Sequence, residues 1–228
     1  MKLFAIMCTR DKDFKPITTK LINTLSSYGV EVKVVVNQQS IFSAYKKGID
    51  GCKADNKDII ICCHDDIDIQ SSKSQFLSAI AKCVHEKTGI VGPAGTTSLG
   101  EDAVWWNHDK WKEGLHRGEV KHISSDQKIS NTYYGAPGRV VVLDGLFLAA
   151  RKEVWEAVGL EKPEYFEGNW DFYDIHYTSR SHLLGYHNYV ILLNIIHHSS
   201  GELVGRDSWY KNRQAFVKNT TLPLEIKI

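Results

Sequence analysis

Short apolar runs alternate with stretches of helical periodicity over the first 92 residues of the chain. The runs at residues 2–8 and 58–63 are mostly apolar, as expected of strands buried on both faces of a sheet, and a further strand is predicted at 30–36. Apolar residues recur at helical spacing between these strands, first at Ile17, Leu21, Leu25 and Tyr28, then at Ile41, Tyr45 and Ile49. A third helix, marked by Phe76, Ile80 and Val84, leads to a short strand at 89–91. This alternation predicts an α/β fold with a mainly parallel twisted sheet and helices on both faces.

The alternation stops after Pro93. Residues 93–138 contain several glycines and the tryptophans Trp105, Trp106 and Trp111, and they predict one long irregular loop. Such loops are often functional, so we expect either a lid over a ligand or tryptophans that serve packing alone. Regular structure resumes with strands at 139–143 and 146–150, helices at 152–158 and 171–184, a strand at 188–196 and a helix at 208–217. We therefore predict a single domain over 1–228, with a regular α/β part at 1–92, the loop at 93–138, and a second regular part with a C-terminal helix at 139–228.

Composition and charge add little to this picture. The 228 residues are 43% hydrophobic and 24% charged, and the net charge is +1, which gives no argument for a nucleic-acid partner. No apolar run approaches the ~20 residues of a transmembrane helix, and no signal-peptide pattern is visible. The five cysteines form no CxxC pair. We expect a cytoplasmic protein with reduced thiols.

Polar residues gather where the predicted strands end, and ligands bind beyond the carboxyl ends of strands in open α/β sheets. Cys8, Thr9 and Arg10 follow the first strand, Asn37 the second, and the sequence HDDID at 64–68 the third. Three carboxylates within four residues repel one another unless a cation or solvent compensates them, and Mg²⁺ or Mn²⁺ usually takes one or two carboxylates together with substrate phosphates.

Two other interpretations of this segment remain open. One is an acidic turn that faces water. The other is a zinc site made by Cys62, Cys63 and His64, which the opposite orientation of successive strand side chains disfavours.

A strand that runs into an aspartate cluster resembles the metal-binding DxD feature of GT-A fold glycosyltransferases, family 2 in particular. Residues 141–159 are similar to the segment that precedes the acceptor side in that family. Asp174, Arg180 and Gly185 are similar to its ED…R…G signature, and residues 197–201 (HHSSG) to its C-terminal histidine motif. The resemblance covers about residues 1–201, and it implies a nucleotide-binding half at 1–92 and an acceptor half at 139–228. It departs at two positions: His64 replaces the first Asp of the cluster, and Tyr173 replaces the Glu before the catalytic Asp.

The resemblance implies roles for the matching residues. Asp174 would be the general base, with Asp144 close to the donor sugar. The metal ligands would be Asp66 and His197, with Asp68 as a ligand in the alternative register Asp66-Ile67-Asp68. The residues that would bind substrate are Cys8, Thr9, Arg10, Asn37, Asp65, Asp144, Gly145 and Trp170.

The implied reaction transfers a sugar from a nucleotide-diphosphate sugar, UDP-sugar by default, to a hydroxyl group of a glycan or another acceptor. It would require Mn²⁺ or Mg²⁺ and proceed by direct, inverting displacement. One alternative is a sugar-nucleotide-binding domain without catalysis, for which His64 and Tyr173 argue. Another is a sugar nucleotidyltransferase, which the lack of glycine in residues 8–12 disfavours.

Ordinary structural roles also fit the individual residues. Asp144 could form a turn, Asp174 could pair with Arg180, His197 could be a hydrogen-bonded core histidine, and residues 9–11 could be a polar turn.

Overall fold

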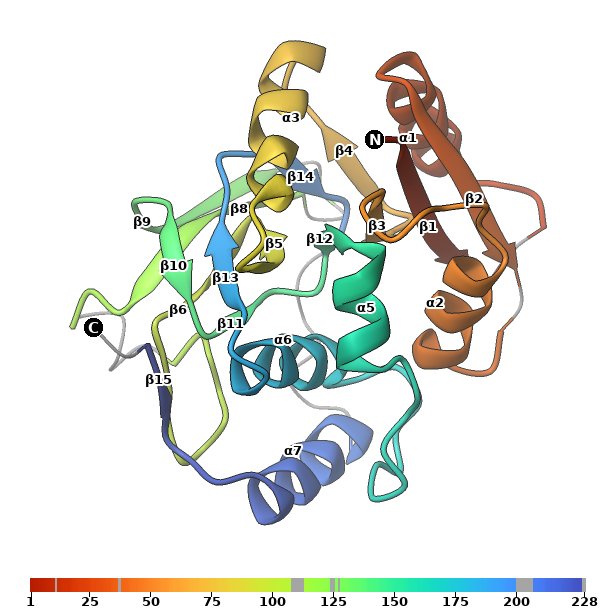
Figure 1. Ribbon diagram of the computed structural model, residues 1–228. Helices are drawn as coiled ribbons and strands as arrows, with labels where there is room; N and C mark the ends of the chain where they lie inside the picture. Colours follow the sequence, from red (N-terminus) through yellow and green to blue (C-terminus); the bar gives the residue numbers. More distant parts are fainter. Residues whose placement is uncertain are drawn as a thin grey trace.

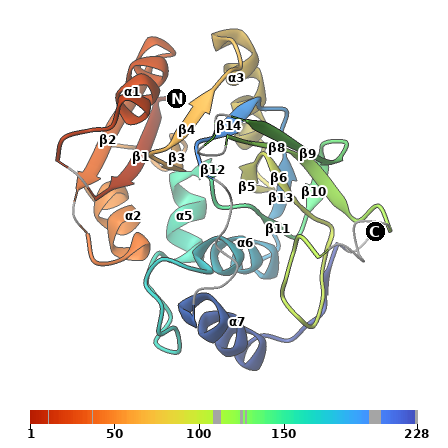
Figure 2. The same cartoon turned by 180° about the vertical axis from the view of Figure 1, so that it is seen from behind.

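Two mixed β-sheets with flanking helices make up the protein, in a computed structural model that describes residues 1–10, 12–36, 38–107, 113–123, 126, 128–199 and 207–226 (Figures 1 and 2). The first sheet has the strand order β10-β13-β5-β12-β3-β1-β2. Its strands are β1 (Leu3–Thr9), β2 (Val30–Val36), β3 (Ile59–His64), β5 (Thr88–Gly92), β10 (Gly138–Val140), β12 (Phe147–Arg151) and β13 (His187–Val190).

The N-terminal part of this sheet is parallel, as the sequence predicts. β1 pairs in parallel with both β2 and β3, and every residue of β3 before His64 is buried. The sheet as a whole is mixed, however, because β12 runs antiparallel between β3 and β5. The crossover from β3 to β5 through α3 leaves room for one strand between them, and β12 fills it. The prediction of a mainly parallel sheet is corrected in this respect.

The second sheet has the order β11-β6-β8-β14-β4, with β9 paired to β8. Its strands are β4 (Ile67–Ile69), β6 (Ala94–Thr96), β8 (His116–Ile123), β9 (Ile129–Gly135), β11 (Val142–Leu143) and β14 (Ile195–His197). A further two-stranded sheet joins β7 (Ser98–Leu99) to β15 (Leu224–Glu225).

Strands therefore occupy much of the segment 93–138, which the sequence predicts to be one irregular loop. The reason lies in β8, where the buried positions are His116, Gly118 and Val120. Only one of these three is apolar, so the two-residue period of burial leaves almost no hydrophobic alternation in the sequence. The role of the segment as a lid stays a prediction.

Four chain segments pass from the first sheet into the second: β3 to β4, β5 to β6, β10 to β11, and β13 to β14. The predicted single strands at 139–143 and 188–196 are each divided by such a passage. Strands commonly change sheets at bends of this kind. The junction between the sheets therefore collects the strand ends that carry the polar residues.

The helices form where the apolar periodicity predicts them: α1 (Pro16–Ser27), α2 (Ile41–Asp50), α3 (Lys73–Ile80), α5 (Lys152–Val158), α6 (Tyr173–Leu183) and α7 (Asp207–Asn219), with a 3₁₀ turn at Ala81–Val84. The Ser40 hydroxyl caps α2 by accepting a hydrogen bond of 3.0 Å from the Ser43 amide. α2 packs on β1 and β2, while α6 packs on β5, β11 and β13. No helix in the described part of the chain combines the length and apolar character of a membrane span.

Candidate metal and sugar-transfer site

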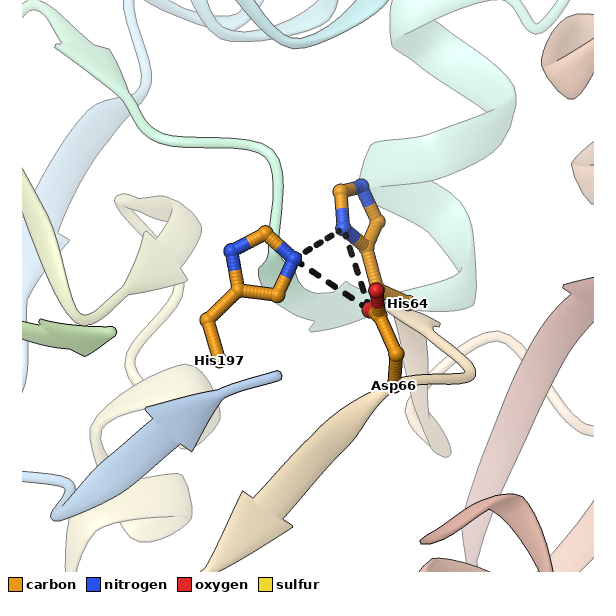
Figure 3. Close-up of side chains that lie close together, drawn as sticks. All are labelled: His64, Asp66 and His197. Carbon is orange, nitrogen blue, oxygen red and sulfur yellow. Dashed lines mark hydrogen bonds and ion pairs between the residues drawn. The ribbon is translucent and has the colours of Figure 1, made fainter. Parts of the chain in front are cut away.

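Three side chains meet at the junction of the two sheets (Figure 3). His64 ends β3, Asp66 lies in the turn to β4, and His197 ends β14. Asp66 Oδ1 is 3.2 Å from His197 Nε2 and 3.8 Å from His64 Nδ1, and the two ring nitrogens are 3.4 Å apart. The ligand atoms of all three residues lie within 4.8 Å of one another. This is the arrangement of a site that can hold a metal ion.

The backbone fixes this geometry. β14 pairs antiparallel with β4, and the register places His197 opposite Ile67. The amide of His198 donates a hydrogen bond of 2.8 Å to the carbonyl of Asp66. The strand that carries His197 is therefore held directly against the turn that carries Asp66.

Burial and charge act against each other in this cluster. Burial raises the pKa of Asp66, but the adjacent His197 and His64 outweigh it and leave that pKa below its ordinary value. Burial lowers the pKa of His197, but Asp66 and then Asp144 outweigh it and raise the pKa. The pKa of His64 is lowered by burial and by His197. The cluster therefore favours an ionised carboxylate beside a neutral His64 ring, which are the protonation states that bind metals.

The donor set fits a divalent cation. Asp66 Oδ1 is buried, and the His197 ring, with Nε2 at 3.2 Å, is its nearest described charged partner. A divalent cation between Asp66, His64 and His197 would take the place of the proton on His197 and neutralise the buried carboxylate.

Tyr173 orients the His64 ring. Its hydroxyl lies 2.7 Å from His64 Nε2 and donates a hydrogen bond of 3.0 Å to the carbonyl oxygen of Gly145. When the hydroxyl proton is donated to Gly145, the bond between Tyr173 and His64 is donated by Nε2–H of His64. His64 Nδ1 is then the unprotonated nitrogen, and it faces Asp66 and His197.

The two departures from the family pattern thus touch each other. His64 stands where the family has Asp, Tyr173 stands where it has Glu, and the phenol holds the imidazole in the tautomer that a metal requires. Sequence reasoning considered His64 as a ligand only in the disfavoured zinc site with Cys62 and Cys63, and not together with Asp66 and His197. The available signal was its two-residue spacing from Asp66 directly after a buried strand.

Asp144 and Asp174 lie beside this cluster. Asp144 Oδ1 accepts a hydrogen bond of 3.0 Å from the amide of Leu146 in the turn before β12. One carboxylate oxygen of Asp144 thus stabilises a turn, as the structural alternative for this residue expects. Asp174 is in the first turn of α6. Burial, followed by the negative charge of Asp144, raises the pKa of Asp174 to about 7. A helix dipole favours an ionised carboxylate in the first turn, but burial and the nearby Asp144 carboxylate outweigh it at Asp174.

Gly145 permits the close approach of α6. A Cβ atom at this position would lie 2.4 Å from the Tyr173 hydroxyl and 2.9 Å from Asp174 Cβ. Arg180, the alternative partner of Asp174, instead donates a hydrogen bond of 2.5 Å to the carbonyl of Val158. The structure therefore brings Asp144, Gly145 and Asp174 together next to the metal cluster.

Four residues predicted to bind substrate lie in two places: Cys8, Thr9 and Arg10 at the end of β1, and Trp170 in the loop before α6. Cys8 is opposite His64 in the register of β1 and β3. Burial and then Asp65 raise the pKa of the Cys8 thiol to about 11, so it is not a thiolate at neutral pH. The exposed Arg10 guanidinium lies 5.6 Å from the ring centroid of Trp170, which joins two predicted substrate-binding residues. The next residue back, Thr9, is buried at the end of β1.

Three further residues were predicted to bind metal or substrate: Asp68, Asp65 and Asn37. Asp68 lies on β4 outside the cluster, because its Oδ2 accepts hydrogen bonds from Lys20 Nζ at 2.7 Å and Gln70 Nε2 at 2.6 Å. Asp68 therefore lies apart from His64, Asp66 and His197, and its role as a metal ligand in the alternative register stays a prediction. The carbonyl of Asp65 accepts a bond of 2.9 Å from the Thr18 hydroxyl, which fixes the turn. Asn37 lies outside the described residues.

The tryptophans of the 93–138 segment serve packing where they are described. Trp105 is buried, and its ring centroid is 5.3 Å from that of Tyr134. Trp106 packs on Trp209 of α7 at 5.6 Å. Trp111 lies outside the described residues.

Comparison with solved structures supports the predicted fold. A structure described as GalNAc-T7 with UDP, GalNAc and Mn²⁺ superposes with a TM-score of 0.60 at 11% sequence identity, over 96% of this chain and 48% of that one. The chain thus spans about half the length of that protein. A197 from STIV superposes with a TM-score of 0.49 at 12% identity, over 86% of this chain and 85% of that one.

Sequence comparison gives the family. No curated protein sequence matches the chain. Residues 4–220, by contrast, match the family described as "Glycosyltransferase like family". The chain therefore belongs to this glycosyltransferase-like family and has the GT-A fold that its sequence predicts.

Proposed function

We propose that the protein transfers a sugar from a UDP-sugar to a hydroxyl group of a glycan or another acceptor, with a divalent cation held by His64, Asp66 and His197. The observation that carries the proposal is this three-residue cluster at the strand ends of a GT-A fold, with Asp144 and Asp174 beside it. The structural neighbour GalNAc-T7, crystallised with UDP, GalNAc and Mn²⁺, supports the choice of donor and metal.

Mn²⁺ is the preferred cation of the proposal. Mg²⁺ favours oxygen ligands, whereas two of the three ligand atoms here are imidazole nitrogens. When bound, the cation supplies Lewis-acid stabilisation of the negative charge on the leaving diphosphate. With the cation bound, His64 and His197 would supply nitrogen donors and Asp66 the one carboxylate, and His197, whose pKa is raised, would release its ring proton on binding.

Asp174 is the proposed general base. The acceptor oxygen attacks the anomeric carbon, the bond from that carbon to the diphosphate oxygen breaks with its electron pair going to the diphosphate, and the hydroxyl proton moves to the Asp174 carboxylate. With a pKa of about 7, Asp174 is ionised in roughly half of the molecules at pH 7. The rate should therefore rise with pH through about 7 and then level off. One direct displacement inverts the anomeric centre.

The test measures Mn²⁺ affinity, UDP affinity and sugar transfer on a set of matched Asp→Asn variants. Asp66→Asn should weaken Mn²⁺ binding at least tenfold, whereas Asp68→Asn, the matched control in the other register, should leave it unchanged. Asp174→Asn should keep metal and UDP binding and slow transfer by roughly 10²–10⁴.

Two outcomes would contradict parts of the proposal. Equal Mn²⁺ affinity of Asp66→Asn and wild type would remove the cluster as the metal site. A wild-type protein that binds UDP and Mn²⁺ but neither transfers nor hydrolyses any UDP-sugar would support a binding domain without catalysis.

A further inference from the structure

A groove with a volume of about 1110 Å³ lies on the face of the second sheet that points away from the metal cluster. The His122 ring of β8 faces His197, with 5.4 Å between ring centroids. Successive strand residues point to opposite faces, so Lys121 and Glu119 point into the groove instead. Tyr133 of β9 is paired with Glu119 and shares its face. The groove and the proposed reaction site therefore use opposite faces of the same strands.

Helix α3 forms one wall of the groove, and Figure 1 shows this helix lying beside β13 and the second sheet. The wall presents hydroxyl and amide groups from Ser74, Gln75 and Ser78, which share one face of the helix. Gln75 uses only its carbonyl oxygen locally, accepting a bond of 2.8 Å from the Ser72 amide. Within the described part of the chain, Gln75 Nε2 and the Ser78 hydroxyl have no hydrogen-bond partner. They are free to bind a hydroxyl-rich ligand.

Aromatic residues also line the groove. Tyr133 is 61% exposed, so much of this residue is accessible to a ligand. Tyr189 is a second aromatic residue of the lining, but the Lys82 ammonium covers one face of its ring at 3.9 Å from the centroid, so stacking is assigned to Tyr133. An exposed phenol offers an apolar face with a polar edge, which complements the C–H face and the hydroxyl edge of a pyranose.

The charged side chains that line the groove already interact with other residues of the groove. Lys121 Nζ lies 3.4 Å from Glu119 Oε1 and donates a bond of 3.0 Å to Asn194 Oδ1, while Lys82 lies over Tyr189. A nucleotide or another anion would need unpaired cations, and those here are already paired with a carboxylate or a ring. The lining is therefore suited to an uncharged ligand.

We propose that this groove binds a neutral oligosaccharide of several sugar rings. Its volume exceeds the ~300–1,000 Å³ of pockets for drug-sized ligands, so a single monosaccharide would leave most of it empty. The groove binds its ligand remote from the reacting atoms, and it needs neither UDP nor metal to do so.

The test measures binding of four neutral hexasaccharides to the full chain by calorimetry and saturation-transfer NMR: cellohexaose, chitohexaose, maltohexaose and mannohexaose. At least one should bind in the absence of Mn²⁺ and UDP. Tyr133→Ala and Gln75→Ala should each weaken its binding, the former by roughly tenfold because a stacked ring is lost. Ile129→Ala, which removes another exposed side chain of β9 outside the groove, and Asp66→Asn should bind as wild type does.

Three results would overturn the proposal: none of the four sugars binds, binding is unchanged in Tyr133→Ala, or Asp66→Asn abolishes it. Self-association that Tyr133→Ala abolishes would also overturn it, because the groove would then be a contact between copies. UDP-sugar turnover is measured in parallel on the same variants. Turnover without hexasaccharide binding refutes the groove alone, and hexasaccharide binding without turnover refutes the proposed transfer alone.

Discussion

Tyr173→Phe removes one buried oxygen atom from the support of the metal cluster. That oxygen accepts the 2.7 Å hydrogen bond from His64 Nε2 and donates the 3.0 Å bond to the Gly145 carbonyl. Without it, the His64 ring is free to move its proton to Nδ1, the nitrogen that faces Asp66 and His197. A ligand held in the wrong tautomer cannot coordinate a metal until it is reset.

The magnitude follows from these two bonds. Each intramolecular hydrogen bond contributes about 0.5–1.5 kcal/mol, so the free energy of unfolding should fall by about 1–3 kcal/mol. Loss of an orienting partner of a metal-binding histidine typically costs about 10–100-fold in metal affinity. Calorimetric titration with Mn²⁺ measures the second effect, and urea denaturation in the absence of metal measures the first.

Tyr177→Phe is the matched control. Tyr177 lies one turn further along α6, is buried, and donates a bond of 3.1 Å to the carbonyl of Leu160 without touching the cluster. It should lose about 0.5–1.5 kcal/mol of stability and keep its Mn²⁺ affinity. The reasoning fails if Tyr173→Phe binds Mn²⁺ within twofold of wild type, or if Tyr177→Phe weakens binding as much as Tyr173→Phe does.

Gly145→Ala should reduce stability by about 1–3 kcal/mol in urea denaturation and weaken Mn²⁺ binding, because its Cβ would lie 2.4 Å from the Tyr173 hydroxyl; an unchanged Mn²⁺ titration would contradict this. Asn188→Ala should lower the free energy of unfolding by about 2–4 kcal/mol. Its side-chain amide makes four buried hydrogen bonds, to the Ile90 amide, the Ser181 hydroxyl and the carbonyls of Val141 and Thr178. A loss below 1 kcal/mol would contradict this, because the four groups would then have found other partners. Burial and then the nearby Arg180 lower the pKa of His176 to about 4 from its ordinary 6.5. Between about pH 4 and pH 6.5 the folded chain therefore binds fewer protons than the unfolded chain. The stability that neutral His176 contributes is fully present above about pH 6.5 and is lost as the pH falls toward 4. Urea midpoints of His176→Gln and wild type should converge over that interval, and parallel curves would exclude the assignment.

The elements that depend on local pattern could be predicted from the sequence. β3 and the HDDID segment after it combine a continuous apolar run with an abrupt change to charge, so both the strand and the polar strand end were found. β8 and β9 were not found, because β8 buries His116 and Gly118, which carry no hydrophobic signal. These strands are identified only by their pairing in the folded chain, and the hydropathy of the sequence does not encode that pairing.

For the candidate site as well, some features could be predicted from the sequence and others could not. Asp66, His197, Asp144 and Asp174 were expected near one another, and they are. Whether Asp68 joins Asp66 could not be decided from the sequence, because His64–Asp66 and Asp66–Asp68 have the same two-residue spacing. In the fold, Asp68 forms an ion pair with Lys20, 48 residues earlier, and lies outside the cluster. The role of His64 likewise depends on Tyr173, which is 109 residues away.

The passage of four chain segments from one sheet into the other has a consequence for how the protein unfolds. Loss of one sheet would free the end of a strand in the other at four places, because β3–β4, β5–β6, β10–β11 and β13–β14 each continue from the first sheet into the second. The cluster of His64, Asp66 and His197 lies between the end of β3 and the end of β14. A fragment that ends near residue 92 would lack β12, the strand between β3 and β5, and would leave two long strand edges unpaired. The chain should therefore melt in one cooperative transition, and its two halves should recover structure only when they are mixed.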